Sequence, residues 1–284
     1  MRVEKNLEKL RCRNGRTNET HFEGDNFFVK TAEVQEESGR KRLAREAWAL
    51  GLSKERGLSV PKVIEYGRDD KDCEFIKLER IHGLVLSRFP VNSQIEIIRK
   101  IGHEMTRLKS VSDGFGWPNT ETSEGEYKEW NEFLYDFTVT YGERLANRCI
   151  ISDRIFSNLL KEIKCFDFSV RKADLIHRDI KSNNILVSED LKKHWLIDWE
   201  NAFLGDGIFD VAVYGSNYGH NRLWGALVEG YCADGGSIVD SKKYKLYEAI
   251  SLIGTIDFLR KMDIDFSQQI DSLKHLSKEL HLDR

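Results

Sequence analysis

The segment from Leu175 to Glu200, LIHRDIKSNNILVSEDLKKHWLIDWE, constrains the fold of this 284-residue chain more than any other. Short apolar runs within it end in polar residues, and a polar turn at residues 188–193 separates NILV from HWLIDW. This pattern predicts a β-hairpin. Apolar residues at helical spacing precede and follow the segment, so the hairpin must interrupt a helical region.

The first eighty residues have a different pattern, mostly of strands with one helix. Residues 16–32 predict two strands joined at Gly24-Asp25-Asn26, and residues 39–56 predict a helix. KVIEYG and CEFIKLERI predict two further strands. From about residue 92 the spacing becomes helical, and Ser93 with Glu96 predicts a capping box at the start of that helix.

These patterns predict an α+β fold with two unequal lobes. The smaller lobe, residues 1–80, would be a small antiparallel β lobe. The larger lobe, residues 83–284, would be mainly helical. A hinge at about residues 79–82 would join the two lobes. A ligand site is expected in the cleft between lobes of unequal size.

Composition excludes several classes of protein. The net charge of −3 lacks the basic excess of a nucleic-acid binder, and no apolar run approaches the roughly 18 residues of a membrane span. The N-terminus has no apolar core of a secretory signal. The five cysteines form no CxxC pair and fit a reducing compartment. We therefore expect a cytoplasmic monomer with no nucleic-acid or membrane partner.

The stretch from His177 to Asn184 fits the H-R-D-x-x-x-x-N pattern of a phosphoryl-transfer catalytic loop. Asp179 would then accept the proton of an attacking hydroxyl. Asn184 could bind a metal through its amide oxygen, and Asp198 at the far strand of the hairpin could complete the site. Mg²⁺ prefers such oxygen ligands and is usually shared with nucleotide phosphates. Asn184 and Asp198 are therefore the candidate Mg²⁺ ligands.

A longer stretch carries a family resemblance. IHRDIKSNNILV followed by WLIDWENAFLGDGIFDVA resembles the catalytic segment of the aminoglycoside phosphotransferase and choline kinase family, relatives of protein kinases. The shared features are, in order, His-x-Asp-x4-Asn, Ile-Asp-Trp-Glu, Gly205-Asp206 and Asp210-Val211-Ala212. The resemblance implies a two-lobed protein-kinase-like fold, in which the lobe of residues 1–80 binds a nucleotide. The lobe of residues 83–284 would then hold the catalytic loop, the metal site and the acceptor site. The resemblance also implies that His177 and Asp210 hold the catalytic loop in shape.

Lys181 matches a lysine that protein kinases place near the γ-phosphate, and with Asp179 it forms the predicted catalytic pair. Lys30 ends the strand FFVK and could reach the α- and β-phosphates of a nucleotide. A carboxylate from the following helix would orient it. Glu46 is preferred for this role to Glu36 and Glu37, which precede the helix.

The remaining nucleotide contacts are predicted from loops. No G-x-G-x-x-G exists near the N-terminus, so Thr17 and Asn18 are the candidates for covering the phosphates, although an ordinary hairpin turn is the alternative. CEFIKLERIHG resembles the connector between the lobes. The backbone from Glu79 to Ile81 would bond the adenine edge, and Leu78 would line the pocket. Backbone recognition leaves ATP and GTP equally acceptable as donors.

The acceptor is predicted to be a small molecule. No proline follows Asp198, so the A-P-E element of protein kinases is absent. Residues 121–137 interleave acids with aromatic residues, which suits a polycationic acceptor but equally suits an amphipathic helix with its aromatics in the core. The late acids Asp263, Asp265 and Asp271 could face the acceptor or be plain surface charge.

We therefore expect Mg²⁺-dependent transfer of the γ-phosphate of ATP or GTP to a hydroxyl of a small, cationic molecule. An aminoglycoside-type antibiotic is the leading candidate, which would make the protein a resistance phosphotransferase. A metabolite kinase acting on choline, ethanolamine or an amino sugar is the alternative. A protein kinase and a nucleotide-binding module without turnover are the further alternatives.

Overall fold

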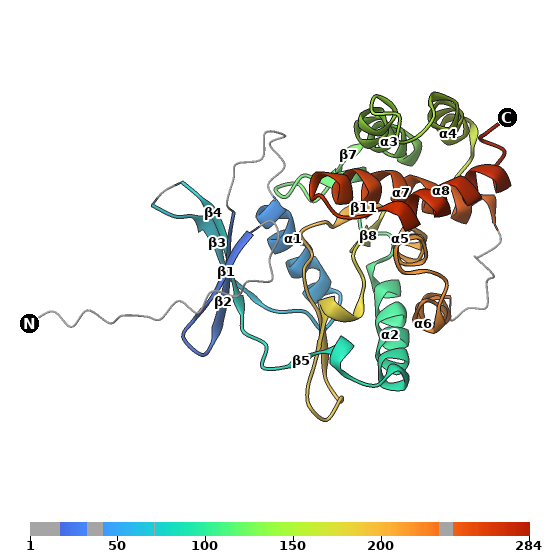
Figure 1. Cartoon of the computed structure of the whole chain (residues 1–284). Coiled ribbons are helices and arrows are strands. Elements are labelled where there is room, and N and C mark those ends of the chain that lie inside the picture. The colour runs from blue at the N-terminus through green and yellow to red at the C-terminus, as the bar shows by residue number, and fades with distance from the viewer. Residues whose placement is uncertain (1–17, 33–41, 71, 233–240) are drawn as a thin grey trace, which may run out of the picture. The chain divides into compact units, whose positions relative to one another are not determined.

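A computed structural model describes residues 18–32, 42–70, 72–232 and 241–284 (Figure 1). The chain divides into two compact units. Unit 1 is Met1–Phe89 with Ser182–Ala202, and unit 2 is Pro90–Lys181 with Phe203–Arg284. The predicted hinge at residues 79–82 lies inside unit 1, and the hairpin segment packs with that unit although unit 2 flanks it in the sequence.

Unit 1 is built from antiparallel sheets and a helix. The first sheet has the strand order β1-β2-β4-β3, and the second has the order β10-β9-β5. Helix α1 packs against β3 and β4 (Figure 1). The elements of this unit are β1 (Asn18–Glu23), β2 (Phe27–Ala32), α1 (Arg42–Glu55), β3 (Val63–Arg68), β4 (Glu74–Glu79), β5 (Leu84–Val85), η1 (Leu86–Arg88), η3 (Ser182–Asn184), β9 (Ile185–Val187) and β10 (His194–Leu196).

The first hairpin forms where the sequence predicts it. Glu23 pairs with Phe27 across the turn, and Gly24 supplies the positive φ of 60° that the turn needs. Strand β2 is central in its sheet, and it places Lys30 opposite Thr20 on one side and Ile76 on the other. A central strand buries its side chains, so Lys30 is 8% exposed and needs anionic partners.

Unit 2 is mainly helical, with one small antiparallel sheet of order β7-β6-β11-β8. Its long helix α7 packs against α3, α5 and α8 (Figure 1). The elements of this unit are α2 (Val91–Met105), η2 (Thr106–Leu108), β6 (Phe115–Pro118), β7 (Gly125–Tyr127), α3 (Trp130–Ala146), α4 (Asp153–Cys165), β8 (Asp174–Ile176), β11 (Phe203–Gly205), α5 (Ile208–Tyr218), α6 (Arg222–Tyr231), α7 (Lys242–Lys261) and α8 (Ser267–Glu279). The predicted α+β fold, with an antiparallel β lobe and a mainly helical lobe, is confirmed.

An aromatic core supports the small sheet of unit 2. Trp130 and Phe133 from α3 contact Phe203 of β11, and Trp130 also contacts Phe209 of α5 and Tyr247 of α7. All of these rings are buried. Aromatic side chains bury large areas and lose little conformational entropy, so this cluster fixes β11 and its neighbour β8 firmly. The strand β8 leads directly into His177, so the core sets where the predicted catalytic loop begins.

The start of α2 differs from its prediction. The helix begins at Val91 with Pro90 as its N-cap and no side-chain cap bond, so the predicted Ser93–Glu96 capping box is wrong. Proline at this position already has the φ of −55° that a helix start tolerates, and its carbonyl accepts the first bond, from Gln94 N. Among the described helices, none is long and apolar enough to cross a membrane.

Two glycines let α2 and α6 pack at close range. A Cβ on Gly230 would lie 2.1 Å from the carbonyl oxygen of Arg99, and one on Gly102 would lie 2.6 Å from that of Leu227. Both neighbours are helix backbone that cannot yield alone. We expect Gly230→Ala to lower the free energy of unfolding by about 1–3 kcal/mol, because the helices must separate. Thermal and urea melts would measure the change.

Gly225 on the same helix is the matched control, because a Cβ there would meet nothing within 4 Å. Gly225→Ala should be neutral or stabilising by up to about 1 kcal/mol through helix propensity alone. Equal melting temperatures for the two variants would contradict the close-packing argument.

Candidate active site

Asp210 holds the predicted catalytic loop by accepting two backbone hydrogen bonds. The N–H groups of His177 and Arg178 donate to its carboxylate at 2.9 and 2.5 Å. His177 is fully buried, and its Nδ1 accepts from the Asp179 N–H at 3.1 Å. The backbone of Arg178 has a φ of 69°, in the left-handed region that residues other than glycine rarely adopt. Its guanidinium lies 4.8 Å from the ring centre of Phe137. The loop is thus held in a strained conformation, as functional loops often are.

Each oxygen of the Asp179 carboxylate contacts a neighbouring side chain. Lys181 Nζ donates to Oδ2 at 2.6 Å, and the hydroxyl of Tyr218, at the end of α5, lies 3.5 Å from Oδ1. Burial raises the pKa of Tyr218, and the neighbouring Asp179 charge raises it further, so the phenol stays protonated and can donate. The predicted catalytic pair Asp179 and Lys181 therefore lies together within unit 2.

Replacing Asp210 with Asn tests the loop-holding role through its pH dependence. Burial raises the pKa of Asp210 to about 7, although the two N–H donors lower it. A folded-state pKa above the unfolded value means that stability falls as pH rises through the window from about 4 to 7. Asn cannot titrate, so the stability of wild type relative to Asp210→Asn should decline across that window and level off above it.

Thermal melts of both proteins from about pH 4 to 8 would measure this difference. Asp113→Asn is the control, because Asp113 is an exposed acid paired with Lys172 at the surface of the same unit. Its stability curve should run parallel to that of wild type. A constant difference between wild type and Asp210→Asn would contradict the burial argument.

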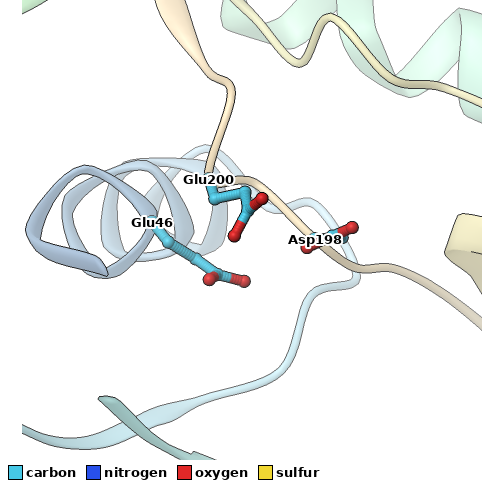
Figure 2. A group of neighbouring side chains, drawn as sticks. All are labelled: Glu46, Asp198 and Glu200. Carbon is cyan, nitrogen blue, oxygen red and sulfur yellow. The ribbon is translucent and has the colours of Figure 1, made fainter. Parts of the chain in front are cut away.

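In unit 1, the carboxylates of Glu46, Asp198 and Glu200 lie close together (Figure 2). Lys30 Nζ lies 2.8 Å from Glu46 Oε1 and 2.8 Å from Asp198 Oδ1. Glu46 comes from α1, whereas Asp198 and Glu200 come from the segment after β10 (Figure 2). The preference for Glu46 as the partner of Lys30 thus agrees with the observed contact. Glu36 and Glu37 lie outside the described residues.

The three acids of this group repel one another, and Lys30 offsets part of that repulsion. Burial lowers the pKa of Lys30, but Glu46, Asp198 and Glu200 together outweigh it and raise the pKa, so the ammonium keeps its proton. Burial raises the pKa of Glu46, and Asp198 and Glu200 add to that rise while Lys30 opposes it. Arg42 also lies 4.0 Å from Glu200 Oε1, so what a bound cation would relieve is the repulsion among the three carboxylates.

This donor set fits Mg²⁺. One oxygen from each of Glu46, Asp198 and Glu200 can be chosen so that all lie within 4.8 Å of one another, and carboxylate oxygen is the ligand that Mg²⁺ prefers. Asp198 is the more accessible acid, with 36% of its side chain exposed. Its φ of 71° turns the backbone at this point. Asn184 lies nearby in the same unit, because its carbonyl accepts from Ile197 N at 2.9 Å.

Glu200 is a site residue that the sequence reasoning did not select. Its carboxylate accepts from Asn18 Nδ2 at 2.7 Å, and its carbonyl accepts from Arg45 at 2.8 and 2.6 Å. The feature of the sequence that points to Glu200 is its position two residues after Asp198. Asn18, predicted to cover the phosphates, is 8% exposed and engaged with Glu200. Thr17 lies outside the described residues, so that part of the prediction stays open.

The connector residues lie at the end of β4 within unit 1. Leu78 is buried, and the N–H groups of Glu79 and Arg80 donate to the carbonyls of Lys62 and Asn26. These two N–H groups are therefore engaged within unit 1, and the contact of the Glu79–Ile81 backbone with an adenine edge stays a prediction.

In the acidic and aromatic stretch, residues 121–137, the large aromatic rings lie in the core, as the amphipathic-helix alternative expects. Trp130, Phe133 and Phe137 are all buried within the aromatic core. Two of the three late acids have local partners: Asp265 accepts from Ser267 N at the start of α8, and Asp271 lies 3.3 Å from Lys274. These contacts account for Asp265 and Asp271 without an acceptor, and the role of Asp263 stays a prediction.

Solved structures share this fold. A thermostable mutant of aminoglycoside phosphotransferase APH(4)-Ia in its apo form matches with a TM-score of 0.75 at 14% identity, over 96% of this chain and 94% of that one. The same enzyme in a ternary complex with AMP-PNP and hygromycin B matches with a TM-score of 0.74 at 13% identity, over 97% and 94%. The GDP and kanamycin complex of APH(2")-IIIa matches with a TM-score of 0.64 at 15% identity, over 96% and 91%.

The fold is therefore that of the kinase-like aminoglycoside phosphotransferases, and identities this low establish the fold alone. The family model of the phosphotransferase enzyme family matches residues 11–247, which is most of the chain. The chain belongs to this family of phosphotransferase enzymes, as the sequence resemblance indicated. A search of the curated proteins gave no match.

Proposed function

We propose that this enzyme transfers the γ-phosphate of ATP or GTP to a hydroxyl of a small cationic acceptor of the aminoglycoside type. The observation that carries the proposal is Lys30, held at 2.8 Å by both Glu46 and Asp198 in a chain of the phosphotransferase family. A buried lysine fixed between two acids is ready to bind phosphate oxygens. Related structures hold AMP-PNP with hygromycin B, and GDP with kanamycin, which supports this donor and acceptor class.

Asp179 would accept the proton of the acceptor hydroxyl while the new oxygen–phosphorus bond forms. The bond from the γ-phosphorus to the bridging oxygen breaks, and the nucleoside diphosphate leaves. Lys181, already 2.6 Å from Asp179, would orient that carboxylate and offset charge on the transferred group. Catalysis of this type consists largely of positioning and charge stabilisation.

Asp198 and Asn184 would hold Mg²⁺, with Glu200 close enough to assist. Bound Mg²⁺ would neutralise negative charge on the nucleotide phosphates. Lys30, with Glu46 orienting it, would bind the α- and β-phosphates, and Leu78 with the Glu79–Ile81 backbone would hold the base. The cytoplasm, where both nucleotides are available, is the proposed location.

A nucleotide-consumption screen would test the proposal. ATP and GTP would each be offered with Mg²⁺ and hygromycin B, kanamycin, choline, ethanolamine or an amino sugar. Acceptor-dependent turnover with an aminoglycoside, lost in Asp179→Asn, supports the proposal. Turnover confined to choline, ethanolamine or the sugar would keep the mechanism and replace the acceptor class. Tight Mg²⁺·nucleotide binding without any turnover would overturn the small-molecule acceptor.

A further inference from the structure

Four side chains form a cluster near the end of α5 to which the mechanism above gives no role. His220 Nε2 lies 2.6 Å from Glu248 Oε1 on α7. The His220 ring packs on Trp224 of α6 with ring centres 4.5 Å apart, and Trp224 Nε1 donates to the Tyr244 hydroxyl at 2.9 Å. We call His220, Trp224, Tyr244 and Glu248 the α5-end cluster.

The cluster follows closely in the chain after a residue that contacts Asp179. Tyr218, whose hydroxyl is 3.5 Å from Asp179, precedes His220 by two residues. The segment between α5 and α6 therefore connects the Asp179 contact to His220. One acceptor molecule would have to reach both, with its hydroxyl at Asp179 and a second group in the cluster.

Gly215 gives the cluster its polar centre. A Cβ there would lie 2.6 Å from the Tyr244 hydroxyl, 2.7 Å from Glu248 Oε1 and 2.8 Å from His220 Nε2. Three polar atoms thus converge on a bare helix backbone. Glu248 is only 3% exposed, whereas 49% of the His220 side chain is exposed, so the imidazole is the accessible member of the pair.

The chemistry of the cluster suits an organic cation. A buried carboxylate bordered by the rings of Trp224 and Tyr244 offers charge pairing and cation–π contact to an ammonium group. His220 already occupies this position as the partner of Glu248. Replacing a half-exposed imidazole costs less than dislodging a buried side chain, since one of its faces already meets water.

We propose that Glu248, with Trp224 and Tyr244, binds an ammonium group of the acceptor, and that His220 competes for the same carboxylate and makes acceptor affinity pH-dependent. This inference rests on the proposed function. The hydrogen bond to Glu248 raises the pKa of His220, while burial opposes the rise. At low pH the imidazolium neutralises Glu248 and excludes the acceptor cation. At high pH the neutral imidazole leaves the carboxylate charge to the acceptor.

The other charged or titratable groups near His220 do not produce the same pH dependence of acceptor affinity. Among the described residues, Glu248 is the charged group in contact with it. Arg222 of α6 is directed toward Asn92 of α2, 3.2 Å from its Oδ1. Burial raises the pKa of Tyr244, so that hydroxyl stays neutral across the working range. His220 is therefore the titrating member of the cluster.

The test is the KM for hygromycin B and for kanamycin, from about pH 6 to 9, in wild type, His220→Asn and Glu248→Gln. The acceptor's own amines titrate identically in every assay, so the ratio of KM between variant and wild type at each pH isolates the cluster. The KM of His220→Asn should be about tenfold below wild type at pH 6 and equal to it at pH 9. Glu248→Gln should raise KM about tenfold at pH 9 and little at pH 6.

His275→Asn is the matched control, because His275 forms an exposed pair with Glu279 on α8, at 3.3 Å. Its KM should equal that of wild type at every pH, and the KM for the nucleotide should not change in any variant. Because Glu248 is buried, thermal melts must first show that the Glu248→Gln variant folds. If that variant does not fold, the pH dependence of KM in His220→Asn, at a half-exposed position, tests the proposal alone.

A His220→Asn ratio that is the same at every pH, with normal turnover, would overturn this inference and leave the proposed function intact. Absence of turnover with either aminoglycoside would overturn the proposed acceptor class, and the inference with it.

Discussion

Asp179→Asn is expected to lower kcat by about 10²- to 10⁴-fold, the contribution typical of a positioned general base. The amide keeps the shape of the carboxylate but cannot accept the acceptor proton. It also loses the charge that pairs with Lys181 at 2.6 Å. Nucleotide affinity should change by no more than about twofold, because the residues proposed to bind the donor belong to unit 1 and Asp179 belongs to unit 2.

Steady-state kinetics with the best acceptor of the screen, and nucleotide titrations followed by calorimetry, would measure both effects. Asp113→Asn is again the matched control, since it removes an exposed acid of the same unit. It should retain wild-type kcat. Wild-type turnover by Asp179→Asn would remove Asp179 from the role of base, and lost nucleotide binding would show that it acts on the donor.

The sequence predicts the parts of the site that are continuous in the chain. The loop from His177 to Asn184 is short, so its pattern largely determines its local geometry, and the structure shows Asp179 and Lys181 in contact. Lys30 and Glu46 could be matched because a strand and the next helix of a small lobe must pack together. Their 2.8 Å contact follows from that packing, although their binding roles stay predictions.

The sequence does not predict contacts that depend on side-chain direction between distant helices. His220 and Glu248 are separated by 28 residues on different elements, and no short pattern relates them. Their contact requires the bare backbone of Gly215 between α5 and α7. Similarly, Ser93 and Glu96 satisfy a capping pattern, but Pro90 starts the helix earlier because its φ is already fixed. Tertiary packing decides such cases.

Asp198→Asn is expected to abolish measurable turnover and to weaken Mg²⁺·nucleotide binding by at least about tenfold. An amide oxygen is a weaker ligand for a hard cation than a charged carboxylate. The substitution also removes one of the three acids around Lys30, so like-charge repulsion with Glu46 and Glu200 falls. The melting temperature should therefore hold or rise while function is lost, as happens when a functional site carries unfavourable charge.

Nucleotide titrations with Mg²⁺ and with a chelator, together with thermal melts, separate these effects. Binding without Mg²⁺ should be nearly the same in Asp198→Asn and wild type, because Lys30 keeps Glu46 as its partner. Asp190→Asn is the control: it changes an exposed acid of the same unit, in the turn between β9 and β10. An unchanged Mg²⁺·nucleotide affinity in Asp198→Asn would exclude Asp198 as a metal ligand. A clear fall in melting temperature would instead mean that its pairing with Lys30 stabilises the fold by more than the repulsion costs.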